Sequence, residues 1–376
     1  MKNSKVICIV ANSCKMVFTR RQILTELLAM GNKVVVLAPL DPYLKTFKDL
    51  KGLTFFHLKH LQPGRMNPGR DFLFYRELKR HFERHSPSLI FTFTVKPNIY
   101  GAYAASRLGI RCIPTVTGLG YSYLAGGLKK EFVFFLYKQA FRRIHSVFFL
   151  NSADQALFES RGIVNHDQCQ IVPGAGVNLR FFSPQKKSSS VFRFLFVGRL
   201  LGHKGLREYV EAAEILTNQG VEVEVDLVGP LDAYNPSVIQ AEEVAQWITK
   251  GLVNYYGEAQ DVRPFYQECD ILVMPSYREG ISTVILEALA MERPVIAADV
   301  PGCRDVVNSA CGWLVAPKNS VDLARQMRAC TELETEVLKE MGKRGRSRVE
   351  QLFSKEKAKA SYIAEAQIAE EVYLLA

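Results

Sequence analysis

One stretch in the second half of the chain places two glutamates on either side of a glycine. In "PSYREGISTVILEALAMERPV" (275–295), Glu279 precedes Gly-Ile-Ser, and Glu287 follows within an apolar run of helical spacing. Ser282 is a typical N-cap residue, so Glu279 is predicted to lie in a loop at a helix N-terminus. Free backbone N–H groups and the helix dipole favour a phosphate or a sugar oxygen there. The two carboxylates are offset along one ligand, where they would orient hydroxyls, and are not paired as an acid and a base.

Two cations flank a turn in a second stretch, "FVGRLLGHKGL" (196–206). A strand is predicted to end at Val197 and a helix to open near Gly205, with Arg199 and Lys204 between them. Two fixed cations over a helix N-terminus stabilise the charge that builds up on a leaving diphosphate. The stretch is not a Walker A loop, because Gly205 stands where Ser or Thr would follow the lysine. Taken singly, a capping glutamate or two basic residues on an ordinary turn remain alternatives.

Glycines end further strands of the same half, in "VGP" (228–230), "YYGEAQDV" (255–262) and "DVPGCRDVV" (299–307). A glycine at such a position lets a base or a ribose approach the backbone closely. Because these loops end strands of one predicted domain, they favour a single nucleotide site over unrelated turns.

Short apolar runs alternate with helical patterns along the whole chain, which predicts α/β architecture with two doubly wound Rossmann-like domains facing an interdomain cleft. The expected domains are 1–182, for the acceptor and membrane side, and 192–353, for the donor, joined by a polar linker at 183–191. The final helix, 354–376, is expected to cross back to the N-terminal domain. The predicted strands are 6–11, 33–39, 89–95, 112–118, 146–151, 192–198, 221–229, 252–257, 270–276, 293–299 and 312–317.

Charge divides the chain more sharply than composition does. Residues 1–187 hold 28 Lys and Arg against 10 Asp and Glu, and the remainder holds 20 against 28, giving balances of +18 and −8 that sum to +10. The first half is therefore expected to face an anionic partner, although a solvated basic face is the alternative. No run approaches the roughly 18 apolar residues of a membrane span. Eight scattered cysteines, without a paired spacing, favour reduced thiols in the cytoplasm.

Basic and aromatic residues interleave at 128–145, "LKKEFVFFLYKQAFRRIH". Such stretches lie on anionic membrane surfaces, and core packing of the aromatic stripe is the alternative. A basic Pro/Gly-rich loop at 62–72 is expected to reach toward a polyprenyl diphosphate.

The motifs together resemble the retaining, metal-independent GT-B glycosyltransferases of glycosyltransferase family 4. "VGRL…KG", "VGP", "YYG…DV", "CDILVMPS", "EGISTVILEALA" and "RPVIA" carry the resemblance in the second half. "TFTVKPNIYGAYAASRLGI", "TVTGLGYSY" and "VPGAGVNLRFFSP" resemble members that extend polyprenyl-diphosphate-linked glycans. The resemblance implies that Glu279, Arg199 and Lys204 are catalytic, and that the donor contacts Gly198, Gly229, Gly257, Gly280, Ile281, Ser282 and Glu287. On the acceptor side it implies Asn12, Ser13, Lys96, Thr117, Gly118 and Gly174.

The resemblance further implies transfer of a sugar, expected to be an N-acetylhexosamine, from a UDP-sugar to a polyprenyl-diphosphate-linked saccharide in bacterial surface-glycan assembly. It implies no cofactor or metal. The basic first half and the stretch 128–145 predict an anionic membrane surface as partner and a peripheral location on the cytoplasmic membrane face. The lack of a nucleic-acid-reading motif predicts no nucleic acid as partner. Two departures bear on the acceptor side: "ANSCKMVF" lacks the glycine-rich loop that many members have, and Thr117 stands where many have histidine. A nucleotide-sugar epimerase of the same fold and a non-catalytic nucleotide-sugar-binding protein remain as alternatives.

Overall fold

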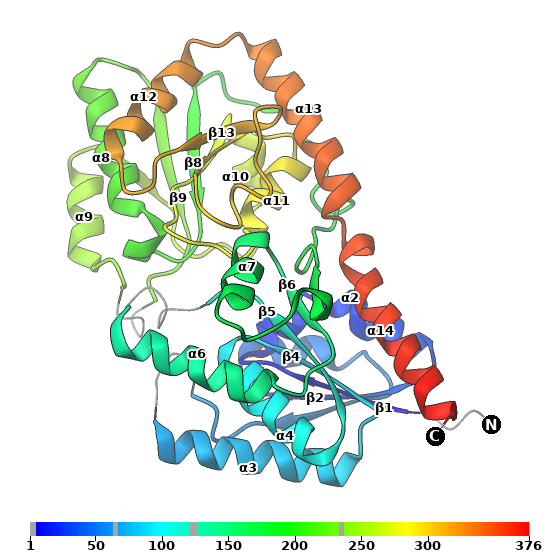
Figure 1. Cartoon of the computed structure of the whole chain (residues 1–376). Helices are drawn as coiled ribbons and strands as arrows, with labels where there is room; N and C mark the ends of the chain where they lie inside the picture. Colours follow the sequence, from blue (N-terminus) through cyan, green and yellow to red (C-terminus); the bar gives the residue numbers. More distant parts are fainter. Residues whose placement is uncertain (1–4, 63–66, 120–125, 233–236, 376) are drawn as a thin grey trace. The chain divides into compact units, whose positions relative to one another are not determined.

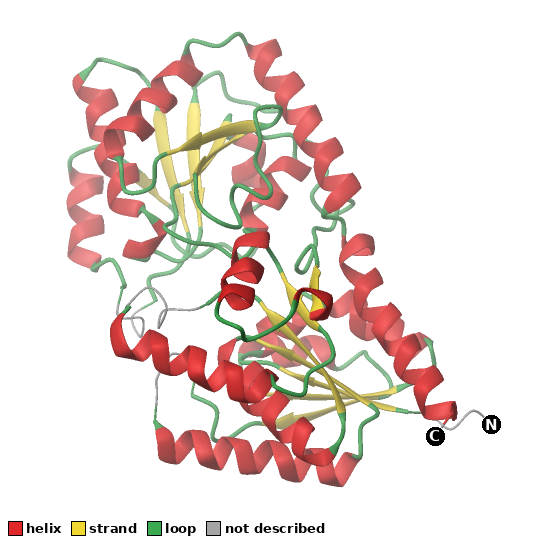
Figure 2. Cartoon of the chain, viewed as in Figure 1, coloured by secondary structure: helices red, strands yellow, loops and turns green. Residues whose placement is uncertain are grey.

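The computed structural model describes residues 5–62, 67–119, 126–232 and 237–375. The chain forms two compact units, the first made of Met1–Ala175 with Lys355–Ala376 and the second of Gly176–Ser354. Each unit contains one parallel sheet with helices on both faces (Figures 1 and 2). The α/β fold class expected from the alternating pattern is thereby confirmed.

The sheet of the first unit has the order β3-β2-β1-β4-β5-β6-β7, and each neighbouring pair is parallel. Its central strands are apolar and buried on both faces, which is why they read as near-continuous hydrophobic runs. The strands are β1 (Val6–Val10), β2 (Lys33–Ala38), β3 (Leu53–His57), β4 (Leu89–Phe93), β5 (Arg111–Val116), β6 (Val147–Phe149) and β7 (Cys169–Ile171).

Helices cover both faces of this sheet. On one face α3, α4 and α6 bury Phe74, Ala104 and Phe134 in a common core with Cys8 and Ile90 of the strands. The helical segments are α1 (Cys14–Phe18), α2 (Arg21–Ala29), η1 (Pro42–Phe47), α3 (Pro68–His85), the π-helical η2 (Pro97–Gly101), α4 (Ala102–Leu108), α6 (Gly127–Phe141), α7 (Ser152–Ser160), η3 (His166–Gln168) and α14 (Lys355–Leu375). Within the described residues, no helix has the length and apolar character needed to cross a membrane.

The last helix, α14, belongs to the first unit and packs against α2. Its Tyr362 is fully buried among Phe91, Phe93 and Phe148, and its hydroxyl lies 3.1 Å from Thr115 Oγ1. Arg111 of β5 donates to Glu365 Oε2 at 2.6 Å, with both side chains largely buried. A long C-terminal helix is thus part of the core of a unit whose other residues are all N-terminal.

The second unit repeats the plan with a parallel sheet in the order β10-β9-β8-β11-β12-β13. Helices α8 and α12 pack together, as do α11 and α13. The strands are β8 (Arg193–Val197), β9 (Glu224–Val228), β10 (Asn254–Tyr255), β11 (Ile271–Met274), β12 (Val295–Ala298) and β13 (Gly312–Val315). The helices are η4 (Gly202–Lys204), α8 (Leu206–Asn218), α9 (Ala241–Thr249), α10 (Arg263–Glu268), α11 (Thr283–Ala290), α12 (Ser320–Thr331) and α13 (Thr335–Leu352).

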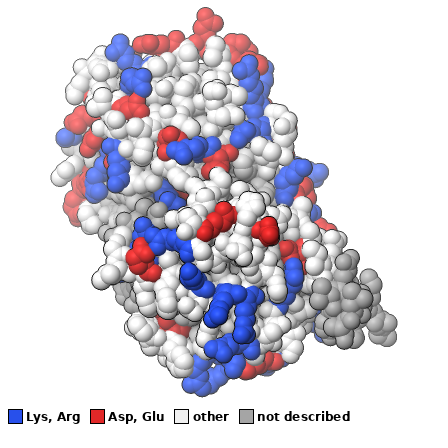
Figure 3. Space-filling view, in the orientation of Figure 1, with Lys and Arg blue, Asp and Glu red and all other residues white. Residues whose placement is uncertain are grey.

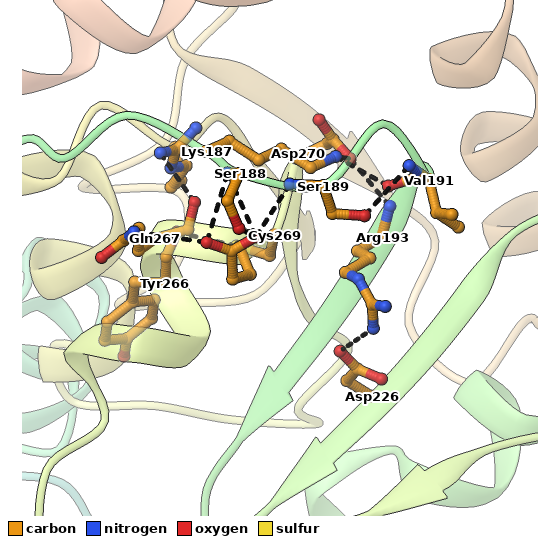
Figure 4. A network of polar contacts seen from close by, with 12 residues as sticks. Lys187, Ser188, Ser189, Val191, Arg193, Asp226, Tyr266, Gln267, Cys269 and Asp270 are labelled. Atoms are coloured by element: carbon orange, nitrogen blue, oxygen red, sulfur yellow. Dashed lines mark hydrogen bonds and ion pairs between the residues drawn. The ribbon is translucent and has the colours of Figure 1, made fainter.

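The polar segment 183–191, expected to be the linker, belongs to the second unit and is held to it by hydrogen bonds and an ion pair (Figure 4). Lys187 Nζ lies 2.5 Å from Asp270 Oδ2, with both side chains mostly buried. The backbone N–H groups of Ser188 and Ser189 both donate to the carboxylate of Glu268. The segment is therefore part of the second unit and not a free linker, and the division between the units falls between Ala175 and Gly176, earlier than the composition suggested.

Candidate active site

The predicted donor loops lie at one edge of the second sheet. Because β10, β9, β8, β11 and β12 are neighbours and parallel, their carboxyl ends meet at that edge. Gly198 follows β8, Gly229 follows β9, Gly257 follows β10, and the loop containing Glu279 follows β11. The structure therefore brings these separate stretches together as the sequence predicted.

Three of the glycines touch through their backbones. Gly198 N–H donates to Val228 O at 2.9 Å, and Gly229 N–H donates to Gly257 O at 2.7 Å. Gly229 has φ +148°, and a Cβ there would lie 1.8 Å from Gly198 O. No side chain fits at that position, so the backbones of β8 and β9 end bare and close together.

Lys204 and Glu279 form the central contact of the site. Lys204 Nζ lies 2.5 Å from Glu279 Oε1, and their side chains are 20% and 12% exposed. The two loops are also joined through their backbones, since Tyr277 N–H donates to His203 O at 3.0 Å. Gly205, at φ +75°, makes this approach possible, because a Cβ there would lie 2.1 Å from Pro275 O. A largely buried cation and a carboxylate at a strand-end loop form a charged anchor for a polar ligand.

A third loop, after β12, supports Glu279 from behind. Glu279 N–H donates to Pro301 O at 3.3 Å. Gly302 has φ +83°, and a Cβ there would lie 2.4 Å from Gly280 O and 2.6 Å from Glu279 O. The neighbouring Cys303 is fully buried, and burial raises the pKa of its thiol, with the carboxylate of Glu279 adding to the effect. Gly302 is the glycine of "DVPGCRDVV", and it was not among the predicted site residues.

Arg199 follows β8 in the same loop as Lys204 but pairs with a different carboxylate. Its Nη1 donates to Asp232 Oδ2 at 2.8 Å, and the Arg199 side chain is 53% exposed. His203 is close to all three predicted catalytic groups: burial, followed by the Lys204 and Arg199 cations, lowers its pKa, whereas Glu279 opposes the shift. The imidazole Nδ1 lies 2.8 Å from Ser237 Oγ. Asp232 and His203 were not predicted as site residues, and no motif quoted for the resemblance includes Asp232.

The remaining donor-side residues lie on α11 or just before it. Ser282 is the N-cap residue, as predicted, but its side chain makes no capping hydrogen bond. Ile281 packs against the core of the unit. Glu287, predicted to contact the ribose, accepts a hydrogen bond of 3.0 Å from the hydroxyl of the fully buried Tyr266. Glu287 therefore lies on α11 itself, whereas Glu279 lies in the loop before that helix, and the predicted ribose contact of Glu287 stays a prediction.

The predicted acceptor-side residues follow strands of the first sheet in the same way. Asn12 and Ser13 follow β1, Lys96 follows β4, Thr117 and Gly118 follow β5, and Gly174 follows β7. Ser13 Oγ accepts from Met16 N–H at 3.1 Å and so caps α1, which is a structural task. Lys96 Nζ lies 2.5 Å from Asp71 Oδ1, with side chains 14% and 8% exposed. Parallel strand ends place the whole set at one edge. Asp71 falls in the stretch 62–72, for which the sequence predicts a loop. Residues 63–66 lie outside the described residues, and residues 68–72 form the start of α3 instead, with Asn67 as its N-cap.

The backbone is unusual next to Lys96. Thr94 has φ +76°, a conformation that β-branched residues rarely adopt, and η2 begins three residues later as a π-helical turn. Both features occur often at functional sites, where the surrounding structure holds them in place. Here the buried Asn98 accepts from Thr92 Oγ1 and donates to Thr115 O, each at 2.8 Å.

Comparison with known proteins assigns the family. Residues 191–332 match the family described as glycosyl transferases group 1, and residues 17–175 match the glycosyl transferase 4-like domain. The chain belongs to the group 1 glycosyltransferases. The family resemblance read from the motifs is confirmed, and the protein is a transferase of sugars rather than an epimerase or a non-catalytic binding protein.

Individual relatives agree with this assignment. The chain is 29% identical over 335 residues to the N,N'-diacetylbacillosaminyl-diphospho-undecaprenol alpha-1,3-N-acetylgalactosaminyltransferase of Campylobacter jejuni, covering 84% of this chain and 86% of that protein. It is 31% identical over 161 residues to the capsular polysaccharide biosynthesis glycosyltransferase CapM of Staphylococcus aureus, covering 42% and 41% of the two chains.

Solved structures show the same fold. The sucrose-phosphate synthase of Thermosynechococcus elongatus superposes with a TM-score of 0.78 at 20% identity, covering 99% of this chain and 100% of the other. Anabaena HepE in complex with UDP-glucose superposes with a TM-score of 0.77 at 19% identity, covering 96% and 99%. The predicted GT-B architecture is therefore confirmed.

Proposed function

We propose that this glycosyltransferase transfers an N-acetylhexosamine from a UDP-sugar to a polyprenyl-diphosphate-linked saccharide during assembly of a bacterial surface glycan, with retention of anomeric configuration. The name of the Campylobacter relative, which describes an N-acetylgalactosaminyltransferase and an undecaprenol-linked diphosphate, supports the donor sugar and the acceptor class. The Staphylococcus relative supports a surface polysaccharide as the product.

The observation that carries the donor-side proposal is the contact between Lys204 and Glu279 at the strand ends of the second unit. In the proposed complex Lys204 and Arg199 hold the diphosphate and stabilise the charge that forms as the glycosidic bond breaks. Glu279 holds hydroxyls of the transferred sugar, and Gly280 to Ser282 contribute contacts from the helix N-terminus. The leaving diphosphate accepts the proton of the acceptor hydroxyl, so that positioning and charge stabilisation provide the catalysis without a metal.

A donor screen tests this proposal. UDP-N-acetylglucosamine, UDP-N-acetylgalactosamine, UDP-glucose and GDP-mannose are incubated with a short polyprenyl-diphosphate-linked sugar, and the product is detected by mass spectrometry. A UDP-N-acetylhexosamine is expected to give product whose new linkage has the anomeric configuration of the donor by NMR. Glu279→Ala and Lys204→Ala serve as inactive controls. Transfer from a GDP-sugar only, or an inverted product, would contradict the proposal.

A second part of the proposal places the first unit on an anionic membrane surface, peripherally at the cytoplasmic face. Helix α6 has two sides: Phe134, Tyr137 and Phe141 are buried, whereas Leu128 and Phe135 are among its exposed residues. The stretch 128–145 therefore both packs in the core and presents an apolar surface. Lys129 and Lys138 are exposed on the same helix, and Arg142 and Arg143, directly after it, are exposed too.

The distribution of charge also supports a membrane surface at α6. In the view of Figure 3, lysine and arginine gather over the part of the first unit where α6 lies in Figure 1. Exposed apolar residues flanked by cations are typical of helices that lie in an anionic interface. Pelleting with phosphatidylglycerol vesicles is expected to be salt-sensitive and weakened by combining Arg142→Glu with Arg143→Glu. If binding is unchanged, the membrane assignment is wrong while the donor-side proposal still stands.

A further inference from the structure

An aromatic pocket lies between α3, α4 and α6 of the first unit. It has a volume of about 430 Å³, within the range typical of small-molecule sites. Helix α3 contributes Phe72 and Tyr75, α4 contributes Tyr103, and α6 contributes Phe132. The proposed transfer chemistry does not use these side chains. Several aromatic rings at one opening suit an apolar ligand.

One side of the pocket adjoins the predicted acceptor site. The carboxylate of Asp71 lines the pocket and also holds Lys96, at 2.5 Å, beside the carboxyl end of β4. Tyr100 lines it as well; its pKa is raised by burial and by the hydrogen bond of its hydroxyl to Asp71. The aromatic lining is therefore continuous with a buried cation that stands among the residues predicted to contact the acceptor.

The other side of the pocket opens toward the proposed membrane surface. Phe72 is 57% exposed and Phe132 is 47% exposed, although both line the pocket. Phe132 lies four residues after Leu128 and three before Phe135, so these exposed side chains share one face of α6. Arg107 also lines the pocket, with its Nη2 donating to Tyr103 OH at 2.9 Å. A ligand in this pocket would have an apolar chain directed to the membrane and an anionic group at the Asp71 end, where the anionic group would share Lys96 with the Asp71 carboxylate.

We propose that the pocket binds the first isoprene units of the polyprenyl chain of the acceptor, an inference that rests on the proposed function. In a polyprenyl diphosphate the charged group is attached directly to the apolar chain, as the adjacent positions of Lys96 and the aromatic lining require. A glycerophospholipid has a glycerol diester between its phosphate and its chains, so it fits this arrangement less well. The pocket thereby sets the depth at which the diphosphate and its attached sugar enter the site.

Binding of radiolabelled farnesyl diphosphate, measured by equilibrium dialysis without membranes, tests this inference. Saturating UDP is present so that the predicted donor site does not capture the diphosphate. Farnesyl diphosphate is expected to bind at least about tenfold more tightly than inorganic diphosphate, and Phe132→Ser to weaken it by about tenfold through lost apolar contact. Phe72→Ser, on a different helix, is expected to act in the same direction. Both side chains are about half exposed, so the variants are expected to fold.

Phe135→Ser is the matched control, because Phe135 is 55% exposed on the same helix but does not line the pocket. It is expected to leave farnesyl diphosphate binding unchanged. Equal losses in Phe132→Ser and Phe135→Ser, or equal affinity for inorganic diphosphate, would overturn the inference. Competition by dihexanoyl phosphatidylglycerol at matched concentration would assign the pocket to phospholipid and overturn it too. Donor turnover is assayed separately, so failure of sugar transfer alongside normal farnesyl diphosphate binding would count against the proposed function alone.

Discussion

The support of Glu279 by Gly302 leads to a prediction whose size follows from the structure. In Gly302→Ala the new Cβ would lie 2.4 Å from Gly280 O and 2.6 Å from Glu279 O, whereas ordinary contact begins at 3.4 Å. The loop that carries Glu279 must therefore move by about 1 Å. A displacement of that size in a positioning element costs on the order of 100-fold in rate, equivalent to about 2.7 kcal/mol of transition-state stabilisation. The positive φ adds about 1 kcal/mol of lost folding stability.

Gly220→Ala separates the two effects, because Gly220 has φ +69° in the same unit and open space around its Cβ position. Gly220→Ala is expected to lose about 1 kcal/mol in urea unfolding from its positive φ alone, and Gly302→Ala is expected to lose more, because its Cβ also meets backbone oxygens. Only Gly302→Ala is expected to lose about 100-fold in kcat/KM, measured as UDP released from the donor in the presence of acceptor. If Gly302→Ala retains the activity of Gly220→Ala, the loop after β12 does not position Glu279, and the reasoning from its close approach is refuted.

Three further predictions concern other contacts. Lys204→Met leaves Glu279 largely buried without its cation, so the free energy of unfolding in urea should fall by about 3 kcal/mol. Combining Lys204→Met with Glu279→Gln should recover most of this stability while donor turnover stays abolished. A single variant as stable as the wild type would contradict this prediction. Burial and neighbouring cations lower the pKa of His203, and a bound diphosphate would raise it. UDP-sugar binding, measured by calorimetry, should therefore become tighter from pH 8 to pH 6 as His203 takes up a proton. His203→Gln should flatten this pH dependence, and the same pH dependence in the variant and the wild type would contradict the prediction. Tyr362→Phe removes the hydroxyl bonded to Thr115 and should cost about 2 kcal/mol in urea unfolding, whereas a neutral result would show that this bond contributes little.

The sequence predicted most strands correctly because they are buried on both faces. Continuous apolar runs such as those of β1, β4 and β11 are unambiguous in an alternating α/β pattern. The strands that were missed, β3 and β7, are the edge strands of the first sheet and are partly exposed, so they lack that signal. Sequence pattern thus identifies the centre of a sheet better than its edges.

Helix α13 was missed for a different reason. Its sequence, "TEVLKEMGKRGRSRVEQL", is rich in charge and contains two glycines, which normally weaken a helix. In the structure a Cβ at Gly342 would lie 2.1 Å from Glu292 O, and one at Gly345 would lie 2.7 Å from Leu289 Cδ2. The glycines therefore permit close packing of α13 on α11 and the turn after it, and this tertiary benefit cannot be read from local propensity.

The donor-side residues were predictable because each lies directly after a strand, and parallel strands carry their ends to one edge. Their partners were not predictable. Asp232 pairs with Arg199 across 33 residues of sequence, and Asp71 pairs with Lys96 across 25. A carboxylate in a loop carries no local signal for the cation it will meet, so the electrostatic environment of each predicted cation required the structure.

These pairings determine how the proposed diphosphate can bind. Both donor-side cations have carboxylate partners, so a diphosphate must share or replace a carboxylate wherever it contacts one. The Arg199–Asp232 pair is the easier one to open, because Arg199 is 53% exposed and surface pairs contribute about 1 kcal/mol or less. The Lys204–Glu279 pair is mostly buried and is better retained. We therefore expect Glu279 to keep one oxygen on Lys204 while the other accepts sugar hydroxyls, so that a single ion pair links the diphosphate to the transferred sugar and holds both in register.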